Sequence, residues 1–381
     1  MIQPVGRFGM RCHKKVVSLQ VKNKAVQFKE VIGQRALINR LTQIIDAGRV
    51  SHAQLFLGRT VCGSLAIAVA YAQYLNCQNR QHFADTTTHD GLRADSCGEC
   101  PSCKKYRELT HPDLHFLFPN VAAANSKKKA SAAMYQEEFR DFMLQHRQYG
   151  TLDQWYEHLH VEKQQGFIRE ADADDAISIL SRKSYEAAYK TMLIWMPERM
   201  NQDAANTLLK TLEEPTPNTL MLLVGESSER LLATVVSRVQ QVNVPPLPPA
   251  QLATVSSEDN AEQAALFVNW MRMLFRLNMQ QLSTWVDQAS ALGRERQKRF
   301  LLYAQDSVRA CLMTHVTGVP LDRDFGDEKF NASFPTMVTE RNADGLCTAL
   351  DEALRAIEGN AYAKIALMEL SFNISRHLKR R

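Results

Sequence analysis

The segment between residues 52 and 75 constrains the fold of this chain most strongly. His52–Leu57 is a short apolar run that predicts a buried strand, and Ser64–Leu75 is an apolar run that predicts a helix. Between them, Gly58 and Gly63 have the spacing of the glycines in a G-x-x-x-x-G-K-[ST] loop, which binds nucleotide phosphates. The sequence therefore predicts a strand–loop–helix unit like that of nucleotide-binding α/β folds.

The same loop lacks the side chains that bind phosphate. Ser64 stands where the motif has its lysine, and Leu65 stands where it has serine or threonine. The lysine would bring a positive charge to the β- and γ-phosphates, and the hydroxyl would hold Mg²⁺. Two glycines five residues apart also occur in an ordinary strand-to-helix turn. We predict a degenerate nucleotide loop, formed by Gly58, Gly63, Ser64 and Leu65, that does not bind ATP productively.

A second part of a nucleotide site is missing farther along the chain. A strand that completes such a site ends in an acid that organises Mg²⁺ and water. The apolar run Thr191–Met196 ends instead in Trp195, Met196 and Pro197. Glu198 is the carboxylate that follows, and we interpret it as a surface residue at the start of a helix, where the helix dipole favours an acid. Two independent losses indicate an inactive ATP site.

Short apolar runs alternate with helical segments through the first 250 residues. Runs that are apolar throughout suit strands buried on both faces, as in a parallel sheet covered by helices. The pattern predicts a doubly wound α/β fold. The expected strands are Leu55–Leu57, Thr191–Met196, Thr219–Val224 and Val239–Val244, and the expected helices include Asn201–Glu214 and Ser227–Val236.

Two segments of this part do not follow the alternation. Residues 1–27 carry six Lys or Arg residues and no acid, and they lack the apolar core of a signal peptide, so we expect a basic N-terminal arm. Residues from about 120 to 165 break the pattern and include a polar, basic stretch at 125–132. We interpret the stretch at 125–132 as a mobile surface insertion, and Trp155 and Tyr156 indicate that the segment then folds back onto the body.

The rest of the chain predicts a second, all-α domain. The proline-rich residues 245–249 end the α/β part at residue 249, and residues 250–260 form a short linker. Residues 261–381 then show helical apolar spacing, in Glu262–Leu277, Gln281–Leu292, Arg294–Thr314 and Ala343–His377. No apolar run approaches the roughly 20 residues that span a bilayer, so we expect a cytoplasmic protein without membrane contact. The net charge of +5 permits contact with nucleic acid but does not argue for it.

Four of the eight cysteines have the spacing of metal ligands. Cys97, Cys100 and Cys103 form a C-x-x-C-x-x-C run, and Cys77 lies upstream, so residues of about 77–110 form the expected module. Four thiolates make a tetrahedral, structural Zn²⁺ site without an open position for water. His82, His89 and His111 are rival fourth ligands, and the remaining cysteines, Cys12, Cys62, Cys311 and Cys347, are expected to be free thiols. A redox C-x-x-C is disfavoured because the motif is not expected to open a helix after a strand.

Arg238 is the candidate for a role outside this chain. It lies in Ser237-Arg238-Val239, between an expected helix and the last expected strand of the sheet. An arginine at such an edge is usually solvated. A guanidinium there would matter if a neighbouring subunit placed a nucleotide against it, because an arginine stabilises the charge that develops during phosphoryl transfer.

Together these features resemble the clamp-loader branch of the AAA+ ATPases, and within it the delta-prime subunits of bacterial DNA polymerase III. The resemblance covers roughly residues 28–249. It is carried by Val31–Gln34, Gly58–Leu65, the cysteine run, His111–Asp113, Asn206–Pro215 and Ser237-Arg238. The insertion and the strand end at Ile194–Glu198 look like the form found in the Bacteroidetes group, and Trp270–Arg272 and Gly293–Tyr303 look like its oligomerisation collar.

The resemblance implies a function as well as a fold. Clamp loaders are five-subunit rings that open a sliding clamp and load it onto primed DNA. A delta-prime subunit acts as a non-catalytic stator beside gamma/tau-like ATPase and delta-like subunits, and it offers the arginine of an S-R-C motif to the neighbouring ATPase. Arg238 is kept here, whereas Val239 replaces the cysteine. The family also places a helical lid before the collar, and residues 250–260 are too few for it.

Two other functions fit parts of the sequence. The first is an active ATPase subunit of the same ring, which the loop at Ser64 and Leu65 and the end of the strand at Met196 oppose. The second is a zinc-bearing nucleic-acid-binding module, with the basic arm and Lys127–Lys129 as its contacts. Nucleotide titration tests the first, and salt-dependent DNA binding by the isolated chain tests the second.

Overall fold

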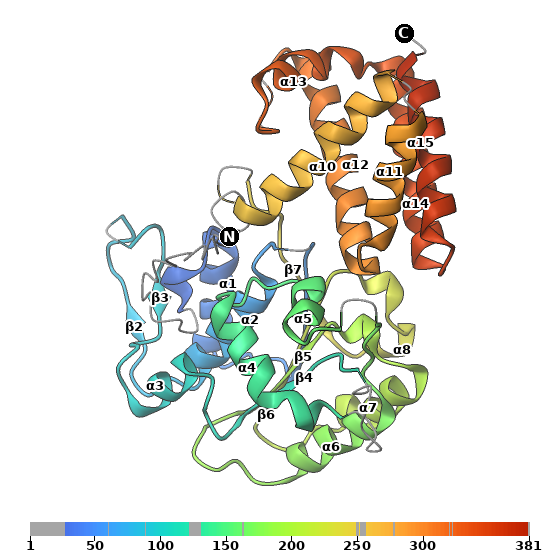
Figure 1. Cartoon of the computed structure of the whole chain (residues 1–381). Helices are drawn as coiled ribbons and strands as arrows, with labels where there is room; N and C mark the ends of the chain where they lie inside the picture. The colour runs from blue at the N-terminus through green and yellow to red at the C-terminus, as the bar shows by residue number, and fades with distance from the viewer. Residues whose placement is uncertain are drawn as a thin grey trace, which may run out of the picture.

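The computed structural model describes the chain from residue 27 to residue 379, with gaps at 60, 88, 122–130, 162–163, 249–250, 252–256, 277–278, 320 and 322. Most of the expected basic arm, the Lys127–Lys129 stretch and most of the expected linker lie outside the described residues. Figure 1 shows an α/β body below and a helical body above it. Each body has a hydrophobic core of its own.

A five-stranded parallel sheet forms the centre of the α/β body, as the sequence predicted. Its strands are β1 (Ala53–Leu57), β4 (Leu114–Leu117), β5 (Lys190–Trp195), β6 (Thr219–Gly225) and β7 (Gln240–Asn243). They lie in the order β4-β5-β6-β1-β7, and every neighbouring pair is parallel. In the register of the sheet, Leu55 of β1 lies opposite Leu223 of β6 and Gln241 of β7. Strand β4, which has four residues and begins directly after the His111–Asp113 turn, was not among the expected strands.

Helices cover the sheet as the doubly wound pattern requires. They are α1 (Arg35–Asp46), α2 (Ser64–Leu75), α6 (Glu170–Ser181), α7 (Gln202–Glu213) and α8 (Ala233–Val236). Helix α2 has the bounds that the sequence predicted, and it is buried along its whole length. The expected helix at residues 227–236 is wrong in extent, because Ser228–Arg230 forms a separate 3-10 turn before the four residues of α8. Further 3-10 turns are Phe28–Glu30, Ala132–Tyr135, Pro197–Arg199 and Pro335–Met337.

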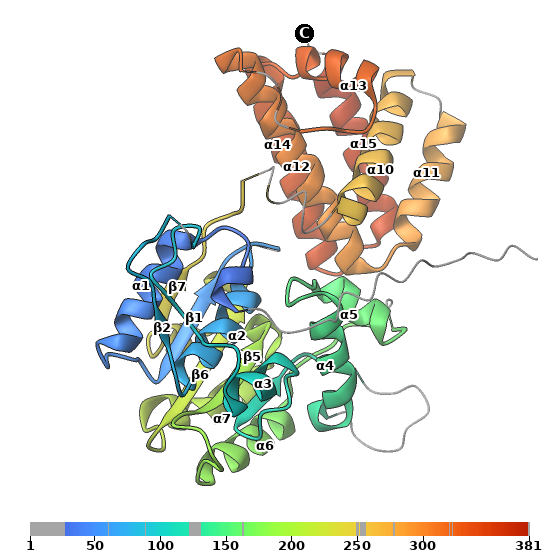
Figure 2. The same cartoon turned by 90° about the vertical axis from the view of Figure 1, so that its left-hand side faces the viewer.

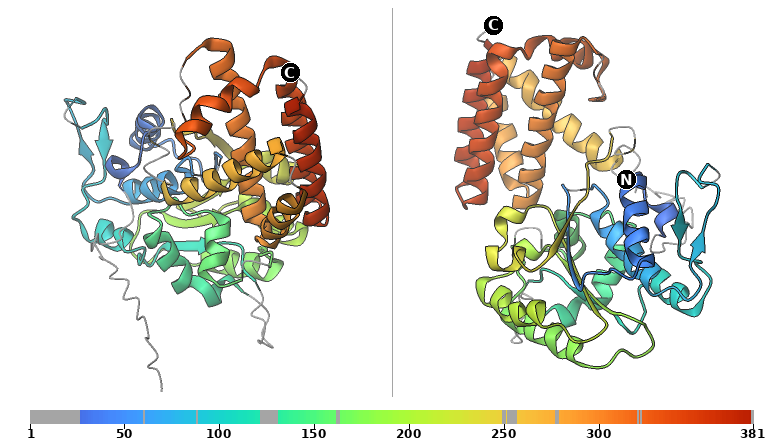
Figure 3. Two further views of the ribbon diagram at one scale, coloured as in Figure 1. Left: turned by 45° about the horizontal axis from the view of Figure 1, so that its top comes forward. Right: turned by 180° about the vertical axis from the view of Figure 1, so that it is seen from behind.

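Two modules are added to this frame. The first holds the cysteines and consists of the antiparallel pair β2 (Gln81–His82) and β3 (Ala94–Asp95) and of α3 (Pro101–Arg107). Figure 3 shows this module from behind, at the side of the α/β body. The second consists of α4 (Gln136–Gln145) and α5 (Leu152–His158). In Figure 2, these two helices lie beside the sheet and directly below the helical body.

The helical body contains α10 (Ser257–Arg276), α11 (Met279–Ala291), α12 (Arg294–Thr317), α13 (Glu328–Ser333), α14 (Glu340–Glu358) and α15 (Ala363–Lys379). Trp270 and Trp285 stack in its core with ring centroids 5.1 Å apart. The expected single helix at 343–377 is two helices, because the chain turns at Gly359 and at Asn360, whose φ is +66°. Helix α10 begins inside the expected linker. Among the described residues, none of the helices has the length and apolar character needed to cross a membrane.

Candidate functional site

The glycine loop lies at the carboxyl end of β1, where a phosphate loop would lie. Gly63 precedes α2 with φ +91°, a conformation that glycine adopts without strain. Gly58 has no room for a side chain, because a Cβ there would lie 2.7 Å from Ser64 Oγ and 3.0 Å from the carbonyl oxygen of Val244. Within the loop, Cys62 Sγ lies 2.9 Å from Ser64 Oγ. The backbone therefore keeps the compact form of a nucleotide loop, while Ser64 bonds locally.

A segment outside the loop fills the space beside it. The ring of Tyr149 covers Gly63, since a Cβ on Gly63 would lie 3.1 Å from Tyr149 Cε1. The amide of Ile32 donates a hydrogen bond of 2.9 Å to the Tyr149 hydroxyl, which fixes the ring. The remaining cavity has a volume of about 40 Å³, whereas small-molecule pockets usually measure about 300–1,000 Å³. Its walls include Gly58, Cys62, Gly63, Ser64, Leu65, Gln148, Tyr149, Gly150, Trp195 and Met196.

Sequence reasoning missed this contact. The polar stretch expected to be mobile, residues 125–132, lies mostly outside the described residues. The expectation that the segment folds back onto the body at Trp155 and Tyr156 is confirmed, since both side chains are almost fully buried, but the contact of Tyr149 with the glycine loop was not foreseen. The signal was present in the aromatic residues Phe139, Phe142 and Trp155, because a segment so rich in aromatic rings must bury them.

The end of β5 differs from the expectation at Glu198. We predicted an exposed residue, but one side-chain oxygen, Oε1, accepts a 2.9 Å hydrogen bond from the amide of Glu226, and the other, Oε2, is shut off from solvent against Gly225. Burial, together with the charge of Glu226, raises the pKa of Glu198 to about 7. Trp195 and Met196 are buried, as their apolar character predicts. A carboxylate exposed to hold Mg²⁺ is therefore missing at this position.

The four cysteines of the predicted metal site meet at one point. The Sγ atoms of Cys77, Cys97, Cys100 and Cys103 all lie within 4.8 Å of one another. Cys97 Sγ lies 3.6 Å from Cys77 Sγ and 3.9 Å from Cys103 Sγ. A tetrahedral Zn²⁺ with Zn–S bonds of about 2.3 Å places its sulfurs about 3.8 Å apart, so the residues fit this ion.

The backbone around the cluster also suits thiolates. The amides of Cys97, Cys100 and Cys103 donate to the sulfurs of Cys77, Cys97 and Cys100 at 3.3–3.4 Å. The hydrogen bond from Cys103 lowers the pKa of Cys77 to about 5. Among the described residues, the group of side chains that could hold a metal consists of these four cysteines and includes no histidine.

The rival histidines contact other groups. His82 lies 3.8 Å from Asp46, His89 stacks on Phe83, and His111 lies 3.4 Å from Glu186. The reason given against a redox motif is wrong, because Cys100 caps the start of α3 shortly after β3. The convergence of four sulfurs favours a metal site instead.

Arg238 lies at the other end of the sheet, just before the edge strand β7. Its Nε donates a 2.6 Å hydrogen bond to Glu213, at the end of α7, and its Nη1 donates a 2.9 Å bond to the Thr234 carbonyl oxygen. About a third of the side chain is exposed. The amino end of β1 is close to Glu213, since His52 Nε2 lies 2.8 Å from the carbonyl oxygen of Leu212. The glycine loop follows the carboxyl end of the same strand, so the two candidate sites lie at opposite ends of the sheet.

The parallel sheet, the glycine loop after β1 and the helical body that follows define an AAA+ type of protein. Residues 33–248 match the family model described as "DNA polymerase III, delta subunit". This chain belongs to the delta-prime family of DNA polymerase III clamp-loader subunits.

Curated relatives agree with the family model. The delta' subunit of Bacillus subtilis is 29% identical over 226 residues, which cover 59% of this chain and 52% of that protein. The delta' subunit of Pseudomonas aeruginosa is 28% identical over 56% of this chain and 48% of that protein. The gamma/tau subunit of Mycobacterium tuberculosis is 24% identical over 61% of this chain and 31% of that protein. The chain spans about half the length of the delta' relatives.

Proposed function

We propose that this chain is a non-catalytic, stator-like subunit of a clamp loader, which helps to load the sliding clamp onto primer-template DNA. Its partners would be a gamma/tau-like ATPase and a delta-like subunit. The observation that carries the proposal is the closed glycine loop, in which Ser64 and Leu65 replace the phosphate-binding side chains and Tyr149 fills the remaining space. A subunit built in this way contributes surfaces to a ring rather than hydrolysis.

Arg238 would contribute to catalysis in the neighbouring subunit as an arginine finger. Arg238 lies two residues before β7, whose four residues span about 13 Å at a rise of about 3.3 Å per residue, so Arg238 is more than about 13 Å from the level of the glycine loop. About a third of the side chain is exposed, at the edge of the sheet, where another subunit could reach it. A γ-phosphate placed there would compete with Glu213 for the planar guanidinium.

The cysteine cluster would hold one structural zinc. Four thiolates leave no open position for a reactive water, so the ion would support the fold of the module around α3. When bound, it would supply cross-linking and charge neutralisation rather than catalysis. Cys77 joins the end of α2 to this module, so the ion would also link it to the α/β core.

Co-expression tests the function directly. The chain, a gamma/tau-type ATPase and a delta-type subunit from the same source are purified together, and the complex is sized by light scattering. We expect a single hetero-oligomer with ATPase activity that responds to clamp and primed DNA. Failure to assemble would overturn the proposal. Micromolar Mg²⁺-ATP binding by the isolated chain would favour an active ATPase, and steep salt-dependent DNA binding would favour a nucleic-acid module.

A further inference from the structure

We propose that the segment from Ser131 to His160, with its helices α4 and α5, is a built-in occupant of the glycine loop and braces that loop against the helical body. This proposal goes beyond the clamp-loader function. It rests on that function in one respect, which is that the glycine loop takes no nucleotide. The segment would do with its own side chains what a bound nucleotide does in an active site of this kind, which is to fill the loop and order its surroundings.

The topology does not need this segment. Strands β4 and β5 are parallel neighbours, and one crossover helix is enough to connect such a pair. Helix α6 supplies that crossover and packs against both strands. Helices α4 and α5 are therefore additional, and their contacts indicate what they do.

The segment is held in place because its aromatic side chains are part of the core of the α/β body. Phe139 stacks on Phe118 with ring centroids 3.9 Å apart, and Trp155 meets Phe139 edge-on at 5.3 Å. Trp155 Nε1 donates a 2.9 Å hydrogen bond to the carbonyl oxygen of Pro119. At Gly150 a Cβ would approach the Phe142 ring to 3.0 Å or less, so the chain passes directly over that ring. The turn between α4 and α5 is thus held in one position.

That turn reaches the glycine loop on one side. Tyr149 lies over Gly63, and its hydroxyl accepts the hydrogen bond from Ile32. Gln148, which precedes it, is buried, donates to the carbonyl oxygen of Met143 and also lines the loop cavity. Tyr149 is the side chain of this turn that lies directly over Gly63.

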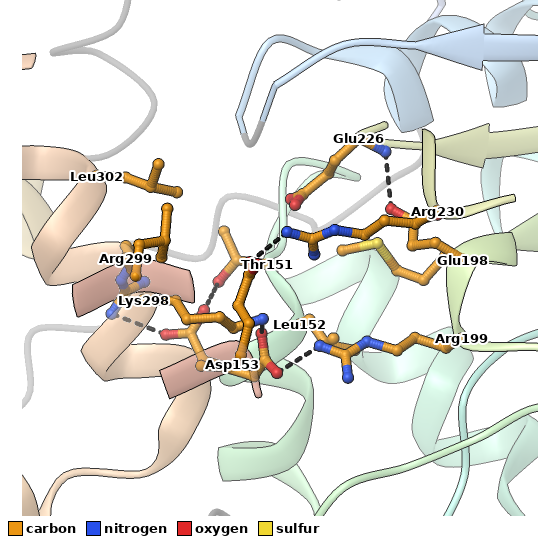
Figure 4. A pocket seen from close by; sticks show the side chains of 14 residues that line it. Thr151, Leu152, Asp153, Glu198, Arg199, Glu226, Arg230, Lys298, Arg299 and Leu302 are labelled. Carbon is orange, nitrogen blue, oxygen red and sulfur yellow. Dashed lines mark hydrogen bonds and ion pairs between the residues drawn. The ribbon is translucent and has the colours of Figure 1, made fainter. Parts of the chain in front are cut away.

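The same turn reaches the helical body on the other side. Asp153, which is 7% exposed, lies 2.8 Å from the guanidinium of Arg299 on α12, which is 17% exposed. The Thr151 hydroxyl donates a 2.6 Å hydrogen bond to the other oxygen of Asp153. Beside this pair, Glu295 of α12 is paired with Arg199 and with Lys298. In Figure 4, Asp153 lies beside Arg299 of the helical body and is also joined to Thr151.

These buried pairs make the joint sensitive to single changes. Removing one partner of a desolvated ion pair leaves an uncompensated charge, which costs far more than an exposed pair contributes. Only three residues separate Tyr149 from Asp153, so a disturbance at α12 is passed to the glycine loop through one tight turn. The orientation of the two bodies is thereby fixed by residues of this chain.

Hydrogen–deuterium exchange on the full chain tests the proposal. We expect Tyr149→Ala to raise exchange in residues 58–65 by about tenfold, because the cover of the loop is lost. Asp153→Asn should raise exchange in residues 294–300 of α12 and, more weakly, in residues 58–65. The matched controls Tyr135→Ala and Asp141→Asn lie in the same segment but outside the loop cavity and the ion pairs, and they should change neither region.

Unchanged exchange at 58–65 in a folded Tyr149→Ala variant would overturn the proposal, as would an effect of Asp153→Asn confined to α12. If Tyr149→Ala does not fold, Tyr149→Phe removes the hydrogen bond from Ile32 alone and should raise exchange at residues 31–34. These measurements need no partner subunit. A failure here is therefore distinct from a failure of ring assembly, which would count against the clamp-loader function.

Discussion

The two ends of the central sheet differ in how far their candidate functional residues are covered. At the carboxyl end of β1, the loop from Gly58 to Gly63 keeps its shape, but Tyr149 closes it. At the amino end of β7, Arg238 is about a third exposed and is held by Glu213 through a hydrogen bond that a ligand could replace. The end that would serve this chain's own nucleotide is filled, whereas the end that faces outward is open.

The difference between the two ends suggests a structural role for the glycine loop and a different role for Arg238. A glycine loop is a compact way to join a strand to a buried helix, so it can remain after its phosphate chemistry is lost. An exposed arginine contributes little to the stability of its own chain, because exposed ion pairs are worth at most about 1 kcal/mol. The closed end therefore has a structural explanation, while the role of Arg238 depends on the partner subunit of the proposed function.

The largest expected effect comes from Arg238→Ala in the assembled ring. A guanidinium next to a transferring phosphate is worth about 10³–10⁵ in rate at its site, and a ring with several ATP sites loses the share of that site. Arg238→Lys should be nearly as harmful, because an ammonium does not reproduce the fork of donors. Clamp- and DNA-stimulated ATPase activity is the measurement.

The control for this experiment is Arg40→Ala, which removes an exposed arginine of α1. It should leave ATPase activity and assembly unchanged. If the ring assembled with Arg238→Ala hydrolyses ATP and loads clamps at the normal rate, Arg238 is an ordinary surface residue. The open end of the sheet would then have no role in catalysis.

The next effect concerns the metal cluster, whose Cys77 follows the end of α2. We expect about one equivalent of Zn²⁺ in the purified chain and its loss in Cys100→Ser, with loosening of the module, since metal binding and folding are coupled. Cys347→Ser, in the helical body, is the control. Metal analysis measures the zinc content of both variants, and circular dichroism measures their folding. Full metal content in Cys77→Ala would show that Cys77 is not the fourth ligand.

Nucleotide titration sharpens the contrast between the two ends. The chain should show no micromolar affinity for Mg²⁺-ATP, and Ser64→Lys alone should not create it, because Tyr149 still fills the loop. A weak, Mg²⁺-independent interaction is compatible with the amides at the start of α2. Calorimetry measures the affinity. Micromolar binding by either form would mean that the loop is open.

The smallest effect is a dependence of stability on pH through Glu198. Its pKa in the folded chain is about 7, against an ordinary value of 4.5. Between pH 4.5 and about 7, the unfolded chain has lost the Glu198 proton, whereas the folded chain keeps it. The free energy of unfolding therefore falls as the pH rises through this range, by at most about 3 kcal/mol. Glu198→Gln should therefore be more stable than the parent at pH 8 but not at pH 4.

Thermal unfolding at the two pH values measures this effect. Glu229→Gln removes the same charge from an exposed neighbouring residue and should show no such difference. A constant difference between Glu198→Gln and the parent at both pH values would mean that folding does not shift the pKa of Glu198. The strand end would then be more open to solvent than its contacts indicate.

Several parts of the fold could be predicted from short stretches of sequence. The apolar runs of β1, β5 and β6 and the whole of α2 were evident because parallel strands and a central helix are buried on all sides. The spacing of Cys97, Cys100 and Cys103 was equally informative, because a tight turn brings thiols three residues apart together. Strand β4 was missed because it is short, and its half-buried His115 interrupts the apolar pattern.

The sequence by itself determined which chemistry is lacking, since the identities of Ser64, Leu65 and Trp195 exclude the usual phosphate and Mg²⁺ ligands. Tertiary structure decided what replaces it. Tyr149 meets Ile32 across 117 residues of chain, and Asp153 meets Arg299 from a different body. Local spacing cannot specify such contacts, because they depend on how separately formed elements pack. The burial of Glu198 has the same origin, as its environment is formed by the neighbouring strand β6 rather than by its own segment.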